Sequence, residues 1–199
     1  IVGMAGRYPK APDLEVFWRN LRDGVDAITE VPASRWDHDA IFDPNGRRPG
    51  TTSARWGGFL DKIDSFDPLF FGISPAEANY MDPQERLFLQ TAWHAVEEAG
   101  YRPDALRGER IGVFVGAMFS HYQLLSDAAG VRGGASFSSI ANRVSWTLGL
   151  RGPSIAVDTM CSSSLSALHM ALQSLADGGC RAAIVGGVNV MPHPSKFVT

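Results

Sequence analysis

Lysine is scarce in this sequence, and positive charge is not concentrated anywhere along it. Only Lys10, Lys62 and Lys196 are lysines, so arginine supplies most of the positive charge, and the formal net charge is −3. The arginines are scattered along the chain instead of forming a stripe. A protein that binds nucleic acid carries a basic excess or a basic stripe, so we expect no nucleic-acid partner.

Long apolar runs are also missing. No window approaches the roughly 18 consecutive apolar residues that a membrane-spanning helix needs, and no secretory signal opens the chain. A hydrophobic content of 45% with 20% charged residues is ordinary for a globular protein. These absences predict a cytoplasmic location and no membrane partner.

Cysteine is limited to Cys161 and Cys180, which are too few for a disulfide framework. No group of cysteines and histidines has the spacing of zinc ligands, so we expect no metal site. Each cysteine must therefore be judged by its own surroundings.

The two ends of the sequence predict a fragment. The 199 residues suffice for one sizeable core. The chain opens directly on the apolar run at residues 1–4, and it stops at residue 199 shortly after a strand-like run. We therefore expect a fragment that is truncated at both ends.

Apolar periodicity predicts a layered α/β structure. Strands are expected at 1–4, 111–117, 154–157 and 182–190, and helices from Asp13 to Gly24, from Asp82 to Ala99 and from Ser162 to Ala176. In the second helix Asp82 is a plausible N-cap, Pro83 suits the first position, and Glu85 would complete a capping box. Strand runs that are apolar on both faces suit a sheet covered by helices on both sides.

Residues 29–81 are rich in proline, glycine, aspartate and aromatic residues and show no periodicity. A stretch of this length with so many aromatic side chains is not a flexible linker. We expect an ordered loop that wraps the domain and buries its aromatic rings.

Cys161 is the candidate nucleophile. It follows the predicted strand at 154–157 and stands where the small-residue helix begins. The unpaired N–H groups and positive dipole end of a helix N-terminus favour a thiolate, and the same amides can face an oxyanion that forms on a thioester carbonyl. This combination suits covalent acyl transfer. Free cysteines usually behave as small buried hydrophobes, which is the reading we prefer for Cys180.

No base for Cys161 is visible in the local sequence. His169 lies eight residues further along the same helix, about 12 Å away at 1.5 Å per residue, and cannot reach the sulfur. His94 falls on the Asp82 helix, and the remaining histidines fall in predicted loops. A serine-hydrolase elbow and a phosphate-binding glycine fingerprint are both missing.

Four blocks, taken together, resemble the β-ketoacyl synthases of modular polyketide synthases. They are GGFL at 57–60, FDPLFFGISP at 66–75, DPQER at 82–86 with its continuation to EEAG at 97–100, and VDTMCSSSL at 157–165. The blocks occur in the family's order and span essentially the whole chain. The form of the cysteine block, with ANRVS at 141–145 and HPSK at 193–196, is more similar to synthases served by a separate acyltransferase.

The resemblance implies a thiolase-like fold, a layered αβαβα sandwich of two similar halves that dimerises, of which residues 1–199 would be the N-terminal half. It implies that Cys161 accepts an acyl group from carrier-protein phosphopantetheine and that its backbone N–H helps to form the oxyanion hole. Decarboxylative Claisen condensation with malonyl-acyl carrier protein follows. Met118, Phe119 and Met160 are the expected pocket walls, with core packing as the alternative.

The resemblance also implies acyl carrier protein, a second copy of the chain and neighbouring synthase domains as partners, with no cofactor bound directly. The family's two histidines and its lysine belong to motifs of the second half, so the isolated chain is expected to be inactive. Three alternatives stay open: a non-elongating synthase that only transfers acyl chains, a thiolase-fold condensing enzyme that uses coenzyme A thioesters, and a purely structural fragment.

Overall fold

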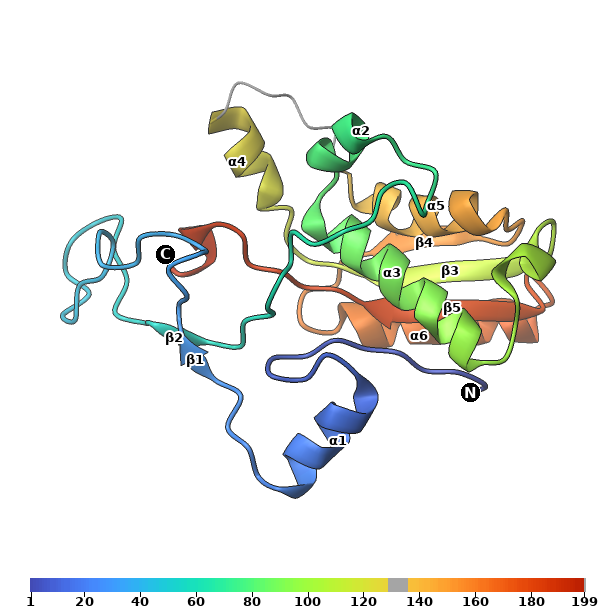
Figure 1. Cartoon of the computed structure of the whole chain (residues 1–199), viewed down its shortest axis with the longest axis horizontal. Helices are drawn as coiled ribbons and strands as arrows, with labels where there is room; N and C mark the ends of the chain where they lie inside the picture. The colour runs from blue at the N-terminus through green and yellow to red at the C-terminus, as the bar shows by residue number, and fades with distance from the viewer. Residues whose placement is uncertain (129–135, 199) are drawn as a thin grey trace.

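A computed structural model describes residues 1–128 and 136–198 of the chain. Its centre is a three-stranded parallel sheet in the order β4-β3-β5, with helices on both faces (Figure 1). In chain order the elements are α1 (Leu14–Arg22), β1 (Thr29–Glu30), β2 (Trp56–Gly57), α2 (Pro75–Tyr80), α3 (Pro83–Glu98), the 3-10 turn η1 (Pro103–Leu106), β3 (Ile111–Gly116), α4 (Tyr122–Ala128), α5 (Phe137–Leu148), β4 (Ser154–Val157), α6 (Ser163–Ala176), β5 (Ala182–Gly187) and the 3-10 turn η2 (Pro194–Lys196).

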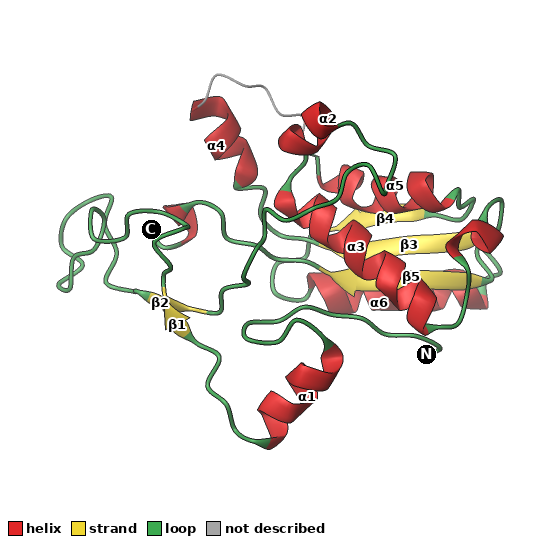
Figure 2. Ribbon diagram, in the orientation of Figure 1, coloured by secondary structure: helices red, strands yellow, loops and turns green. Residues whose placement is uncertain are grey.

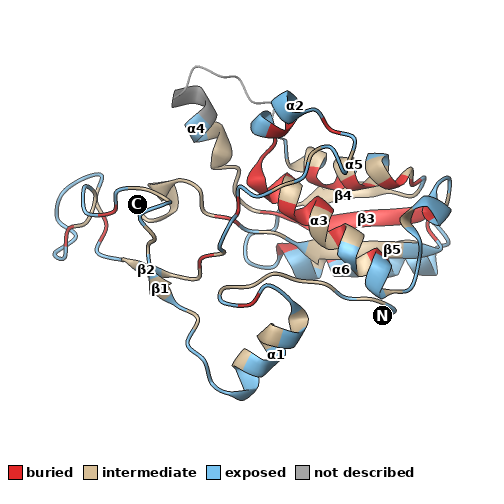
Figure 3. Ribbon diagram, in the orientation of Figure 1, coloured by how far each residue is buried: buried red, intermediate tan, exposed pale blue. Residues whose placement is uncertain are grey.

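The helices form one layer on each side of the sheet. Helices α3 and α5 cover one face and α6 covers the other (Figure 2). Central strand β3 is buried along its whole length, which Figure 3 shows as a continuous buried band. Val113 and Val115 of this strand join the core under α3 and α5, whereas Phe114 packs with Ala167 and Ala171 of α6. The prediction of a layered α/β core is therefore confirmed.

The strand register brings three loops to one edge of the sheet. Gly116 at the end of β3 pairs with Val157 at the end of β4 and with Gly187 at the end of β5. Because all three strands run in parallel, the loops that follow them leave from the same carboxyl edge. Ligand sites of open α/β sheets form at this edge. Strand β5 ends at Gly187, three residues before the predicted end at residue 190.

Helix α3 begins as predicted, but its capping box does not form. The Asp82 carboxylate accepts from the N–H of Gln84 at 2.8 Å, and Pro83 occupies the first turn. The predicted return of the Glu85 side chain to the cap is wrong, because this carboxylate pairs with Arg143 Nε at 2.8 Å and accepts from Ser139 Oγ at 2.8 Å. A guanidinium on α5 offers Glu85 a charge-assisted bond that a neutral backbone amide cannot match.

The predicted strand at residues 1–4 is wrong. The segment runs beside α3 without joining the described sheets, and Ile1 and Val2 are exposed, so burial gives it no reason to pair. The Met4 N–H donates to Glu98 Oε2 at 3.0 Å. Gly3 lies so close to Ala99 that a Cβ atom there would meet the Ala99 methyl at 2.6 Å.

Residues 29–81 pack on the domain only in part: Ile73 joins the core under α3 and α5, and Phe66 and Phe71 pack against that core. Much of the segment forms a lobe beyond the carboxyl edge, next to the C-terminal residues (Figure 1). Trp36 packs edge-on against Phe59 and Phe197 in this lobe, at centroid distances of 6.2 and 5.5 Å. The prediction that the aromatic rings are all buried is wrong for Trp56 and Phe70, which are 59% and 58% exposed.

A helix that spans a membrane must be both long and apolar. Within residues 1–128 and 136–198, no helix has both the length and the apolar composition that such a span requires.

Candidate active site

Cys161 stands in the turn between β4 and α6, where the sequence predicts it, and its side chain is exposed. Helix α6 starts at Ser163, with Ser162 in the cap position, so the cysteine immediately precedes the cap. Cys180 lies between α6 and β5 and is only 2% exposed, in the core cluster with Phe114. The two cysteines therefore differ as predicted in position and accessibility.

Local hydrogen bonds hold the turn before α6. The buried Ser163 hydroxyl accepts from the N–H of Thr159 at 2.9 Å and donates to the carbonyl of Met160 at 2.6 Å. Ser162 Oγ donates to the Thr159 carbonyl at 2.7 Å, and the Met160 N–H donates to Asp158 Oδ1 at 2.9 Å. Met160 has φ 59°, a left-handed conformation that costs a non-glycine residue about 1–3 kcal/mol. This sharp bend turns the chain from the sheet into the helix.

The start of α6 packs directly on the strand ends, and glycine makes this approach possible. A Cβ atom on Gly116 would lie 2.5 Å from the backbone of Ser163 and Ser164. A Cβ atom on Gly187 would lie 2.9 Å from Cβ of Ser164. Since the obstacle at Gly116 is backbone, a larger residue there would displace the helix start and, with it, the turn that carries Cys161.

The first turn of α6 provides backbone donors beside Cys161. The first helical bond runs from the N–H of Ser166 to the carbonyl of Ser162 at 2.9 Å. The amides of Ser164 and Leu165 therefore have no intrahelical acceptor. Such amides can face an anion at a helix N-terminus. Stabilisation of a thiolate and of an oxyanion at Cys161 stays a prediction.

A buried glutamine joins two loops of the carboxyl edge. Gln84 is 2% exposed; its Nε2 donates to the carbonyl of Phe119 at 2.7 Å and its Oε1 accepts from the N–H of Val190 at 3.3 Å. It thus connects α3 to the loops that follow β3 and β5. Sequence reasoning gave this residue no role. The signal was present: a polar side chain stands in the first turn of a helix whose later turns bury apolar side chains.

The three predicted pocket walls lie in two loops of the same edge. Met118 and Phe119 directly follow β3 and its extension at Ala117, and both are half-buried. Met160 adjoins Cys161 and is 63% exposed, so the described residues do not enclose its side chain. The placement at one edge agrees with a shared site, and the pocket-wall role of all three residues stays a prediction.

No histidine of residues 1–128 and 136–198 hydrogen-bonds to Cys161. His169 is exposed on α6, and His94 Nδ1 lies 3.4 Å from Glu97 Oε2 on the surface of α3. His121 and His193 lie in the loops after β3 and β5, as predicted. The described chain therefore presents the candidate nucleophile without a neighbouring base.

Buried acids surround the start of α3. Asp82 is 4% exposed, and burial raises the pKa of its carboxyl, although bonds from Gln84 act in the opposite direction. Glu85 next to it is neutralised by Arg143, which also reaches Glu77 Oε1 at 2.8 Å. This cluster fixes α3 and α5 relative to one another behind the loops of the carboxyl edge.

The raised pKa of Asp82 predicts how the substitution Asp82→Asn will depend on pH. A carboxyl group whose pKa is raised in the folded state stabilises the fold fully below its ordinary pKa of 3.8. This contribution to stability is lost as the pH rises through the folded-state pKa. Asparagine caps helices as well as aspartate does but does not titrate. The free energy of unfolding of Asp82→Asn, measured in urea and taken relative to the wild type, should therefore increase between pH 3.5 and pH 7. Asp13→Asn, at the exposed cap of α1, is the matched control, and an equal gain there would contradict the prediction.

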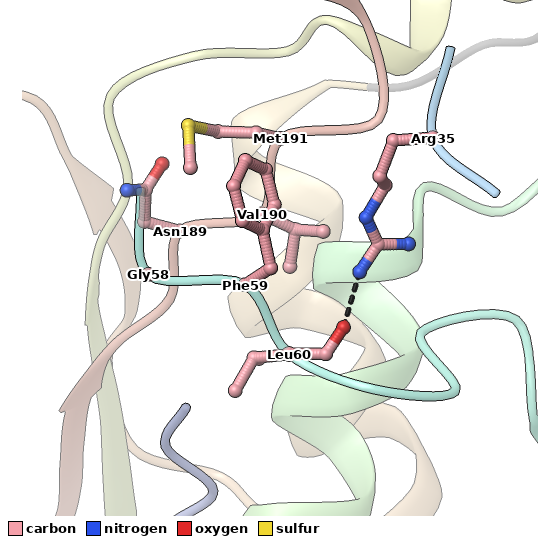
Figure 4. A pocket seen from close by; sticks show the side chains of 7 residues that line it. All are labelled: Arg35, Gly58, Phe59, Leu60, Asn189, Val190 and Met191. Carbon is pink, nitrogen blue, oxygen red and sulfur yellow. Dashed lines mark hydrogen bonds between the residues drawn. The ribbon is translucent and has the colours of Figure 1, made fainter. Parts of the chain in front are cut away.

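Two hollows lie away from the Cys161 turn. One, of about 10 Å³, holds a single water at most. It separates the lobe from the loop after β5, and its lining includes Arg35, Phe59 and Asn189 (Figure 4). The Arg35 guanidinium donates to the Leu60 carbonyl there, and burial lowers its pKa.

The second hollow, of about 480 Å³, is lined by Arg107, Trp146 and Arg151 and lies at the amino ends of the strands. Cys161 lines neither hollow.

An exposed cysteine in a strand-to-helix turn, at the carboxyl edge of a parallel sheet covered on both faces, is an arrangement that suits covalent catalysis by a thiol on an α/β fold. The chain belongs to the β-ketoacyl synthases: residues 1–199 match the model described as "Beta-ketoacyl synthase, N-terminal domain". The predicted family and the thiolase-like fold are thereby confirmed.

Similar proteins are polyketide synthases. Polyketide synthase ThaG of Burkholderia thailandensis is 55% identical over 203 residues, which cover 100% of this chain and 4% of that protein. Polyketide synthase PksL of Bacillus subtilis is 51% identical over 210 residues, covering 100% and 5%. The chain thus spans a small part of each of these relatives.

Solved ketosynthase domains share the structure. The oxazolomycin ketosynthase domain OzmH KS7 of Streptomyces albus superposes with a TM-score of 0.95 at 54% identity, covering 100% of this chain and 35% of that one. The ketosynthase from module 6 of the bacillaene synthase of Bacillus subtilis gives 0.89 at 42% identity, covering 99% and 32%. The chain spans about a third of these domains.

Proposed function

We propose that the chain carries the acyl-accepting cysteine of a polyketide ketosynthase. The observation that supports this most directly is the exposed thiol of Cys161 at the start of α6, in a chain of the ketosynthase family. The Cys161 thiolate attacks an acyl thioester on the phosphopantetheine arm of a carrier protein. The carbonyl carbon forms a bond to sulfur, and the carrier thiol leaves with a proton.

The second step is a decarboxylative condensation. Malonyl-carrier protein loses carbon dioxide, and the resulting carbanion attacks the acyl carbonyl on Cys161. A carbon–carbon bond forms, the carbon–sulfur bond to Cys161 breaks, and the free thiolate returns while the β-ketoacyl chain stays on the carrier. The N–H of Cys161 and the free amides of the first turn of α6 are the proposed oxyanion donors.

Substrate recognition and assembly follow from the same proposal. Met118, Phe119 and Met160 form walls of the acyl pocket. The protein acts as a homodimer, receives its acyl groups from acyl carrier protein, works beside other synthase domains in the cytoplasm and binds no cofactor directly. Its malonyl groups come from a separate acyltransferase.

Single-turnover assays on the intact enzyme test the function. Acylated enzyme is mixed with malonyl-carrier protein, and the carrier is analysed by mass spectrometry. A β-ketoacyl product longer by two carbons, with release of carbon dioxide, is the expected result. Transfer of the unchanged acyl chain to a carrier would instead identify a non-elongating synthase, and acceptance of coenzyme A thioesters alone would contradict the carrier-protein assignment.

A further inference from the structure

Two basic side chains contact Phe119 at the carboxyl edge of the sheet, and a third lies close enough to act on one of them. The His121 ring stacks on Phe119 with centroids 4.8 Å apart and 18° between the planes. The Lys196 ammonium lies 5.0 Å from the centroid of the same phenyl ring. Burial lowers the pKa of His121, and its basic neighbours His193 and Lys196 lower it further. The loops after β3 and β5 therefore bring His121, His193 and Lys196 into one electrostatic neighbourhood.

This basic cluster, made of His121, His193 and Lys196, has no acidic partner. Over residues 1–128 and 136–198, none of its side chains pairs with a carboxylate. The two groups that act electrostatically on His121 are both basic. Basic groups that gather without counter-charge repel one another, and an anion between them would remove that repulsion.

Two buried polar atoms near the basic cluster also lack partners. In the described chain, His121 Nδ1 and Ser195 Oγ are buried and make no hydrogen bond. Buried polar atoms nearly always have a partner, which can be an ordered water or a bound ion. His193 Nδ1 accepts from the N–H of Ser195 at 3.1 Å, so its proton must be on Nε2, which is then a donor. The neighbourhood thus offers ammonium, imidazole and hydroxyl donors and needs an acceptor.

We propose that the basic cluster binds an oxyanion of the incoming thioester substrate. It lies beside Phe119, in loops at the same carboxyl edge of the sheet as the turn that carries Cys161, and we place the path of the incoming thioester along this edge. The oxyanion has two sources, the phosphodiester of the carrier's pantetheine arm or a carboxylate on the acyl group. Both are planar or tetrahedral oxygen acceptors for charge-assisted hydrogen bonds. This inference rests on the proposed function for the identity of the substrate.

Binding to the intact enzyme tests the site without any turnover. Inorganic phosphate and acetate are titrated by calorimetry and by NMR of the histidine rings, with sodium chloride at equal ionic strength. We expect saturable binding that shifts the His121 and His193 resonances, and the tighter of the two oxyanions identifies the source. Lys196→Met should weaken this binding about tenfold, whereas Lys196→Arg should retain it. Lys62→Met removes the same charge from an exposed lysine and is the matched control. Equal effects of chloride, or unchanged binding in Lys196→Met, would overturn the proposal.

A kinetic comparison separates this inference from the proposed function. Acylation of Cys161 is measured with a phosphopantetheine thioester and with an N-acetylcysteamine thioester of the same acyl group, which lacks the phosphate. If phosphate is the ligand, Lys196→Met should raise KM about tenfold for the first substrate only. If acetate binds more tightly than phosphate, Lys196→Met should instead raise KM only for thioesters whose acyl group carries a carboxylate. An equal change for all substrates would refute the oxyanion site, whereas failure of every thioester to acylate the wild type would refute the proposed function and leave the binding result standing.

Discussion

Replacement of Cys161 by alanine should abolish acyl loading of the intact enzyme. Cys161 is exposed at the start of α6, and no other thiol of the chain is accessible, because Cys180 is buried in the core. Removal of a covalent nucleophile costs on the order of 10⁴-fold or more in rate. The measurement is the rate of covalent acylation from a carrier-bound thioester, followed by mass spectrometry of the peptide that contains residue 161.

Cys180→Ala is the matched control for this experiment. It removes the second thiol but leaves the turn before α6 intact, so loading should continue at the wild-type rate once the variant is folded. Acyl label on Cys180, or label that persists at an undiminished level in Cys161→Ala, would contradict the assignment. Iodoacetamide should likewise modify Cys161 well before Cys180, since only the first sulfur is accessible.

Arg143→Met should produce the largest loss of stability that we expect from a change outside the Cys161 turn. Arg143 Nε lies 2.8 Å from Oε1 of Glu85, whose side chain is 4% exposed. Removal of the guanidinium leaves a buried carboxylate with Ser139 as its remaining partner. Breaking a buried ion pair in this way costs about 3–5 kcal/mol. Chemical denaturation of the variant and the wild type measures the difference.

Two further variants show whether the buried charge is the cause. Glu77→Gln removes the second, half-exposed carboxylate that Arg143 contacts, and it should cost less than about 1 kcal/mol. Glu85→Gln combined with Arg143→Met removes the unpaired charge and should recover part of the lost stability. A double variant as unstable as Arg143→Met alone would mean that lost packing, and not the buried charge, is responsible.

The central sheet and its covering helices were predictable because their side-chain periods are strong. Residues 154–157 form β4 as predicted, and the small-residue helix after Cys161 begins within one residue of its expected start. The segment at residues 1–4 is as apolar as a strand, but it is exposed. Its composition predicted a strand wrongly, because composition alone does not state whether a partner strand is present.

The position of the candidate nucleophile could be predicted, but the long-range contacts behind its loops could not. Cys161 is marked by its place between a strand and a helix, which are neighbours in sequence. Gln84 and Arg143 act on residues that are distant along the chain, at separations of 35, 106 and 58 residues. A single sequence contains no signal for such pairings, so the polar cluster behind the loops became visible only in three dimensions. Glu85 illustrates the error that results, since its local capping role was predicted and its long-range ion pair was missed.

The amide of Gln84 has a consequence for chimaeric synthases. One side chain bonds to the loops after both β3 and β5, so three segments at residues 84, 119 and 190 form a single hydrogen-bonded unit. A recombination breakpoint placed between α3 and β5 would join this glutamine from one parent to a loop from another. Both of its partners are backbone groups, whose chemistry is the same whichever parent supplies the loop. The two anchoring bonds can therefore persist when loop sequences are exchanged, provided that the loops keep their length.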